Sequence, residues 1–193
     1  MQGAAEYRLK YVGIVSALLS GCYIPSFANY PSTWEPLDET GPVDVEKSIS
    51  GEYKCEGELA STYAKGTVIL TTFLIRGTVD RLGQCQTAIF SPQGAHGIRI
   101  EFRYLDGHVK TAALQRGQDY EVVGNWINLR RHREFQDGQN GFGFVAGGNR
   151  LTLTTNRALI VKSEAKGFGL MLMVPFVDAG HNFARFNRIA ALP

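Results

Sequence analysis

The segment GIRIEFRY, residues 97–104, constrains the fold of this chain more than any other stretch, because its apolar and polar residues alternate. One face of the extended segment carries Ile98, Ile100, Phe102 and Tyr104. Successive side chains of a strand point to opposite faces, so this period of two predicts a half-buried β-strand. Asp106-Gly107 follows directly and predicts a hairpin, because both residues accept the positive φ angles of a tight turn.

Strand signals continue to the end of the chain. DYEVVGNWINLRR (119–131) predicts one strand bent at Gly124, and GFGFVAGGNRLTLTT (141–155) predicts a strand, a glycine turn and a second strand. NRALIVKSE follows a turn at Asn156-Arg157, and GFGLMLMV and NFARFNRI complete the series. We therefore expect a mainly β fold with at most one short helix. Its antiparallel meander would close into a lipocalin-like barrel or curl into a sandwich, since closure removes exposed edges.

The segment TVILTTFLIRG, Thr67–Gly77, leaves two structures open. Its β-branched residues favour a strand. Leu70, Phe73, Leu74 and Gly77 also fit one face of a helix. The pattern alone does not decide between them.

Composition limits the class of protein. Apolar residues make up 44% of the chain and charged residues 20%, which is typical of a folded globular protein. The 20 basic and 18 acidic residues nearly balance. Nucleic-acid binding requires a dominant basic face, so no nucleic-acid partner is expected.

The first 21 residues have the organisation of a secretory signal peptide. Arg8 and Lys10 lie in a polar start, residues 11–19 form a short apolar run, and Ser20 and Gly21 are small. The apolar run is shorter than the roughly 20 residues that a membrane-spanning helix requires. We therefore expect residues 1–21 to be removed, although an amphipathic first helix of a soluble domain is an alternative.

Leu19-Ser20-Gly21-Cys22 resembles the lipobox of bacterial lipoproteins. The resemblance implies that the Cys22 thiol receives a diacylglyceryl group, that the leader is cut before Cys22, and that the new amine is acylated. The membrane would then be a partner through this lipid. Tyr23 stands where Asp usually signals retention in the inner membrane, so the expected location is the periplasmic face of the outer membrane. An ordinary signal peptide with a chance cysteine is the alternative.

Two cysteines, Cys55 and Cys85, remain if Cys22 carries lipid. An even number in an oxidising compartment predicts one disulfide, and two separate buried thiols are the alternative. Neither cysteine has a C-x-x-C partner and the histidines are scattered, so we expect no metal or cofactor.

Residues 22–46 are predicted to be a lipidated N-terminus and an extended tether, and residues 47–193 a β-rich periplasmic domain. The tether holds Pro25, Pro31, Pro36 and Pro42, four of the seven prolines. Its aromatic residues Phe27, Tyr30 and Trp34 are expected to dock on the domain or to lie near lipid headgroups.

Two stretches are candidates for a binding function. Arg130, Arg131 and Arg133 form the densest basic run, which either grips anionic phosphates, as arginine does with two parallel hydrogen bonds, or ends a solvated strand. GFGLMLMVPF, residues 167–176, is apolar without alternation. Such a strand is buried centrally, or has one face on a cavity or an interface.

Catalytic motifs do not stand out. The chain has neither G-x-S-x-G nor G-K-[ST], and turns explain its glycine-rich stretches. Asp178 and His181 are the best candidates for a hydrolase site in the envelope. The first hypothesis is instead a non-enzymatic binding or structural module, which holds a small apolar ligand or packs on an envelope protein.

Both ends of the domain also resemble a group of uncharacterised lipoproteins of Gram-negative bacteria. Ile49-Ser50-Gly51-x-Tyr53 opens the domain, and a G-L-x-L-x-x-P segment precedes a terminal R-F-x-R-I at 185–189. The resemblance covers the lipobox and the two ends of the domain, and covers the middle only weakly. It implies the same compartment and a β-rich fold, and it implies no activity.

Overall fold

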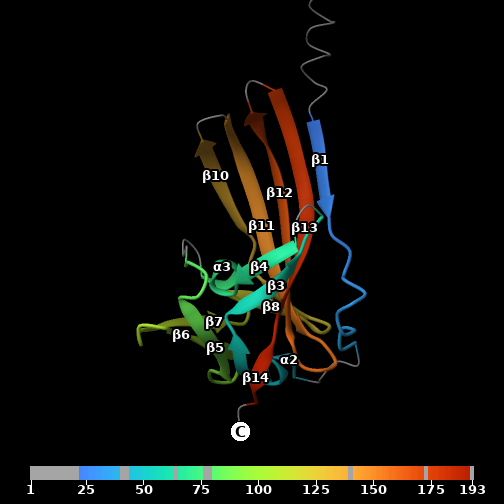
Figure 1. Cartoon of the computed structure of the whole chain (residues 1–193). Coiled ribbons are helices and arrows are strands. Elements are labelled where there is room, and N and C mark those ends of the chain that lie inside the picture. Colours follow the sequence, from blue (N-terminus) through green and yellow to red (C-terminus); the bar gives the residue numbers. More distant parts are fainter. Residues whose placement is uncertain are drawn as a thin grey trace, which may run out of the picture.

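The computed structural model describes residues 22–39, 44–62, 65–75, 80–138, 141–171 and 174–191. These residues form two sheets and two single-turn helices, α2 (Val45–Ser48) and α3 (Thr71–Leu74) (Figure 1). The nine-stranded sheet contains β1 (Cys22–Phe27), β3 (Glu56–Ala60), β4 (Lys65–Ile69), β8 (Tyr120–Val123), β9 (Trp126–Leu129), β10 (His132–Gly138), β11 (Gly141–Leu153), β12 (Leu159–Met171) and β13 (Val174–Phe186). The five-stranded sheet contains β2 (Gly51–Lys54), β5 (Cys85–Pro92), β6 (Gly97–Tyr104), β7 (Val109–Gln115) and β14 (Arg188–Ala190).

The strand order confirms the predicted mainly β, antiparallel fold. The larger sheet runs β4-β3-β13-β12-β11-β9-β8, with β10 added on β11, and the smaller runs β14-β2-β5-β6-β7. Among the described strands, β1 is the one that lies parallel to its partner, β13. In the part of the chain that the structure describes, both orders end on open strands, so the sheets curl and do not close into a barrel.

The main core lies between the two sheets. The face predicted from GIRIEFRY is buried, since Ile98, Ile100, Phe102 and Tyr104 all belong to this core. The larger sheet contributes Leu151, Leu153, Leu159, Val161, Ala184 and Phe186. Residues of both sheets thus bury one face each against the other, as a two-layer architecture requires.

The ambiguous stretch Thr67–Gly77 contains both predicted structures. Strand β4 ends at Ile69 and α3 begins at Thr71, while Gly77 lies outside the described residues. Helix α2 is a second single turn, where at most one short helix was expected. Its Asp44 side chain accepts a hydrogen bond from the Lys47 N–H at 3.2 Å, and this cap starts the turn.

Two predicted turns are confirmed, and one predicted bend is wrong. The turn at Asp106-Gly107 joins β6 to β7 with Gly107 at φ 84°, and the turn at Asn156-Arg157 has Arg157 at φ 69°, so both predictions are confirmed. The bent strand at 119–131 is wrong. Gly124, at φ 59°, begins a tight turn that pairs Val123 with Trp126, so this stretch is the β8–β9 hairpin.

The glycine turn predicted in AGGNR is also wrong. Strand β11 runs without interruption for 13 residues through Gly147 and Gly148. A Cβ atom at Gly147 would lie 3.0 Å from the His132 ring, and one at Gly148 would lie 2.9 Å from the Arg131 side chain. These glycines therefore allow neighbouring side chains to cross the strand closely, which is a use of glycine that local sequence does not distinguish from a turn.

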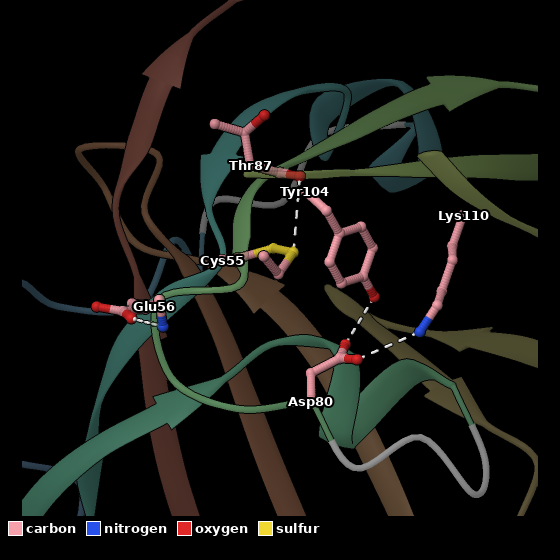
Figure 2. Close-up of a disulfide and its surroundings, with 8 residues drawn as sticks. Cys55, Glu56, Asp80, Thr87, Tyr104 and Lys110 are labelled. Atoms are coloured by element: carbon pink, nitrogen blue, oxygen red, sulfur yellow. Dashed lines mark hydrogen bonds and ion pairs between the residues drawn. A yellow bond between two sulfur atoms is a disulfide. The ribbon is translucent and has the colours of Figure 1, made fainter. Parts of the chain in front are cut away.

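Cys55 and Cys85 form the predicted disulfide, with their Cα atoms 5.6 Å apart (Figure 2). Both residues are buried in the main core. Cys55 lies between β2 and β3, where the chain passes from the smaller sheet to the larger one. The bond therefore ties the start of β5 to the point at which the two sheets are joined.

Asp80 lies close to the disulfide and is held by two side chains (Figure 2). The Tyr104 hydroxyl donates a hydrogen bond to it at 2.6 Å, and the Lys110 ammonium donates one at 3.2 Å. Burial by itself would raise the pKa of Asp80, but the hydrogen bonds from Tyr104 and Lys110 and the positive charge of Lys110 lower this pKa overall. The carboxylate is thus stabilised in its charged form.

The segment predicted as a tether lies along the domain. Residues 22–27 pair with β13, and a second core holds Ala28, Trp34, Ile160 and Phe183 with Tyr30 packed against it. The Trp34 ring N–H donates to Glu58 at 3.1 Å. This segment is therefore bound to the domain and includes the first residues of α2, and Tyr30 and Trp34 dock on the domain.

Candidate functional site

Strands β1, β10, β11, β12 and β13 extend beyond the main core as a single layer (Figure 1). We call this layer the outer sheet; it comprises residues 22–26, 132–138, 141–147, 165–171 and 174–180. Cys22 begins β1 at the far end of this layer and lies opposite Phe176 of β13. The predicted lipidation position is therefore at the end of the molecule that is farthest from the main core.

A row of large apolar side chains crosses one face of the outer sheet. Phe135 is opposite Phe144, Phe144 is opposite Phe168, and Phe168 is opposite Val177 on four adjacent strands. The ring centroids of the first pair are 5.1 Å apart, and those of the second are 5.6 Å apart. The four side chains, which we call the aromatic row, are 54%, 51%, 60% and 47% exposed in that order.

Glycine occupies the other face at the same level. Gly143 precedes Phe144, and Gly167 and Gly169 flank Phe168. Since side chains alternate between faces, the phenylalanines gather on one face and the glycines on the other. Local patterns do not reveal this row, because they predict a turn for the glycine-rich stretch around Gly143 and a single non-alternating strand for residues 167–176. The structure instead divides residues 167–176 between the end of β12 and the start of β13. The alternation of Gly and Phe in two separate segments was the available signal.

Two cations lie beside the aromatic row. Arg133 is two residues from Phe135 on β10, and Lys166 is two residues from Phe168 on β12, so both are on the face of the row. Ala146 is the register partner of each and lies between them. Both cationic side chains are exposed.

A carboxylate cluster follows further along the same face. The Glu164 carboxylate forms ion pairs with Lys162 at 3.2 Å, with Arg150 at 3.4 Å and with Arg131 at 3.5 Å. Burial by itself would raise the pKa of Glu164, but the Lys162 hydrogen bond and the three positive charges lower it. One carboxylate thus offsets part of the charge of three cations.

The three predicted anion-binding arginines have different surroundings, although Arg130 lines one cleft together with Arg131 and an adjoining cleft together with Arg133. Arg131 pairs with Glu164, whereas Arg133 lies beside the aromatic row. Arg130 follows β9, where its backbone N–H donates to the Asp119 carbonyl at 2.7 Å. Its side chain lines two adjoining clefts of about 280 and 680 Å³. The larger cleft also contains Phe73, Leu114 and Leu129.

Asp178 and His181 are not brought together. They are three residues apart on β13, so their side chains point to opposite faces of the sheet. Asp178 is exposed, and His181 packs between the rings of Phe27 and Phe183 at 5.3 and 5.6 Å. The pair that the hydrolase hypothesis requires is absent from this strand.

The described residues also bear on metal binding and on membrane crossing. Nowhere among them do three or more His, Cys, Asp or Glu side chains meet in a way that would hold a metal ion. No helix in these ranges has the length and apolar character needed to cross a membrane.

Comparison of the chain with protein families, with curated proteins and with solved structures found no match.

Proposed function

We propose that the protein is a bacterial lipoprotein of the cell envelope that acts as a non-enzymatic binding or structural module. In this proposal residues 1–21 are the leader, Cys22 carries the lipid, and the domain lies on the periplasmic face of the outer membrane. The aromatic row is its binding surface. One observation carries the proposal. Cys22 begins the edge strand of the outer sheet, and Tyr23, the next residue, is the register partner of Val177 in the aromatic row.

The position of Cys22 favours anchoring. A lipid attached there leaves the end of the outer sheet without having to pass the main core, which lies at the other end of β11–β13. Two or more acyl chains hold a protein stably on a bilayer, at about 0.8 kcal/mol for each buried methylene.

The exposure of the aromatic row favours a binding role. Scattered exposed apolar residues are normal on a protein surface, but contiguous apolar patches mark interaction sites. Three phenylalanine rings in contact, each about half exposed, form such a patch. Carriage of a small apolar ligand stays an alternative prediction, and the larger cleft beside Arg130 is where we expect that ligand.

Lipidation at Cys22 is tested by substitution and labelling. Cys22→Ser should abolish incorporation of a fatty-acid probe into the protein and leave the leader uncut, because the substituted residue has no thiol to acylate. Cys55→Ala/Cys85→Ala is the matched control, which removes the other two cysteines and should keep the label. Unchanged labelling of the Cys22→Ser protein would refute the proposal.

A further inference from the structure

We infer that the aromatic row, with Arg133 and Lys166, is a docking surface for an anionic lipid bilayer. The inference rests on the proposed function, which puts the protein at a membrane of the cell envelope. It identifies the partner of the binding surface as the bilayer itself. The domain would then be held against the membrane in one orientation, and the Cys22 lipid would be a second attachment at the same place.

The order of residues along the strands matches the layers of a bilayer surface. Amphipathic elements that lie on membranes bury Phe and similar side chains at the boundary of headgroups and acyl chains. Arg133 and Lys166 are two residues from the row, which is about 7 Å along a strand. Their apolar stems lie beside the rings while their charged ends reach the phosphates, as long cationic side chains do at membrane interfaces.

Charge distinguishes the two faces of the outer sheet. Within the outer sheet, the charged side chains described on the face of the aromatic row are Arg133 and Lys166, and both are positive. Beyond the outer sheet on the same face, the Glu164 carboxylate is paired with three cations. The opposite face carries the carboxylate of Asp178, and no lysine or arginine is among its described side chains. An anionic surface is therefore attracted to one face and repelled by the other.

The sheet edges limit how deeply the layer can enter. Within the described residues, β1 pairs with β13 alone and β10 pairs with β11 alone, so each presents one row of backbone groups without strand partners. Open edges of this kind do not occur in the hydrocarbon region, where backbone groups have no water to bond. The row therefore meets the membrane face-on, with its rings at headgroup depth.

The register also connects this surface to the lipid. Because Val177 lies opposite Tyr23, the acylated residue would be adjacent to one end of the row. Residues 22–27 are paired along β13, so this end of the chain is not a slack linker. The lipid and the row thus meet the same membrane surface.

The test measures vesicle binding by unlipidated protein, so that it does not depend on acylation. Every described strand and both cores lie within residues 22–191, so we expect the chain from residue 22 with Cys22→Ser to keep the fold. It should float with vesicles of mixed phosphatidylglycerol and phosphatidylcholine, and much less with phosphatidylcholine alone. Phe144→Ser/Phe168→Ser should weaken binding about tenfold or more, because each ring loses the apolar area that it would bury.

Two single substitutions test the contribution of the cations to vesicle binding, and a double substitution outside the row is the control. Arg133→Gln and Lys166→Gln should each weaken binding to the anionic vesicles about fivefold and make it less sensitive to salt. Leu82→Ser/Leu105→Ser removes two exposed leucines outside the row and should change nothing. Urea unfolding of each variant shows that the fold is kept.

Three results would overturn the inference. They are no binding to anionic vesicles, binding that Phe144→Ser/Phe168→Ser leaves unchanged, and a concentration-dependent dimer that this pair of substitutions abolishes while vesicle binding persists. The last result would assign the row to a second copy of the chain. Failure of Cys22 labelling with intact vesicle binding would refute lipidation alone, so the two proposals are tested separately.

Discussion

The disulfide between Cys55 and Cys85 gives the most direct test of how the two sheets are held together. Cys55→Ala/Cys85→Ala removes the bond and leaves small apolar side chains in a buried place. Alanine is preferable to serine here, because a buried hydroxyl without a partner adds a cost of its own.

The magnitude follows from the length of the closed loop. The two cysteines are separated by 30 residues. In the chain-entropy model a crosslink of this span restricts the unfolded chain enough to contribute about 3–4 kcal/mol to the free energy of unfolding. For a chain of this size the loss should lower the melting temperature by about 6–16 °C.

The backbone around the bond should survive its removal. The Cys55 N–H donates to the Gln86 carbonyl at 3.0 Å, and the Cys55 carbonyl accepts from the Leu70 N–H at 2.8 Å. Neither hydrogen bond involves a sulfur atom. The lower free energy of unfolding is therefore expected to come from the greater freedom of the unfolded chain, and the folded structure should be kept.

Urea and thermal unfolding measure the effect, with and without a reductant. Reduced wild-type protein should be as unstable as the double variant, and the variant should not respond to the reductant. The reasoning is refuted if the variant is as stable as oxidised wild type. Two free thiols at Cys55 and Cys85 in unfolded, unreduced protein would refute it as well.

Two further predictions concern other parts of the fold. Because the folded pKa of Asp80 is lowered, its stabilisation is present above the ordinary aspartate pKa of about 3.9 and is lost as the pH falls through the folded value. Asp80→Asn should therefore cost about 1–3 kcal/mol near neutral pH and flatten the acid limb of melting temperature against pH; an unchanged acid limb would contradict this. Gly180→Val should detach β1, because its Cβ atom would overlap the Ser26 carbonyl oxygen. We expect faster proteolysis within residues 22–39, unlike Gly66→Val, which has open space around it; equal rates for the two variants would count against this contact.

The local patterns in the sequence predicted the elements whose cause is local. The alternation in GIRIEFRY sets which face of β6 is buried, because the side-chain period of a strand is two whatever its partner. The turns at Asp106-Gly107 and Asn156-Arg157 depend on the φ angles of residues within the turn itself. The disulfide followed from the number of cysteines left after Cys22 was assigned to lipid.

The prediction of a turn in the glycine-rich stretch of β11 was wrong for the opposite reason, because the cause there is not local. A glycine at a turn and a glycine beneath a crossing side chain have the same local sequence signal. The difference at Gly147 and Gly148 is made by His132 and Arg131, which the β10–β11 pairing places over them. Similarly, the chain forms a hairpin at Gly124, where a bend was predicted, because β8 and β9 pair with each other.

The candidate site shows the same division. From the sequence we predicted Cys22 and a basic run, since each is a short contiguous motif. The aromatic row joins Phe135, Phe144 and Phe168, which belong to three strands, and only their register puts them side by side. Register depends on every pair along two strands, and a shift of one residue would turn each phenylalanine to the opposite face. The tertiary structure therefore decided that these rings form one surface, and that this surface lies beside the residue where the lipid is expected.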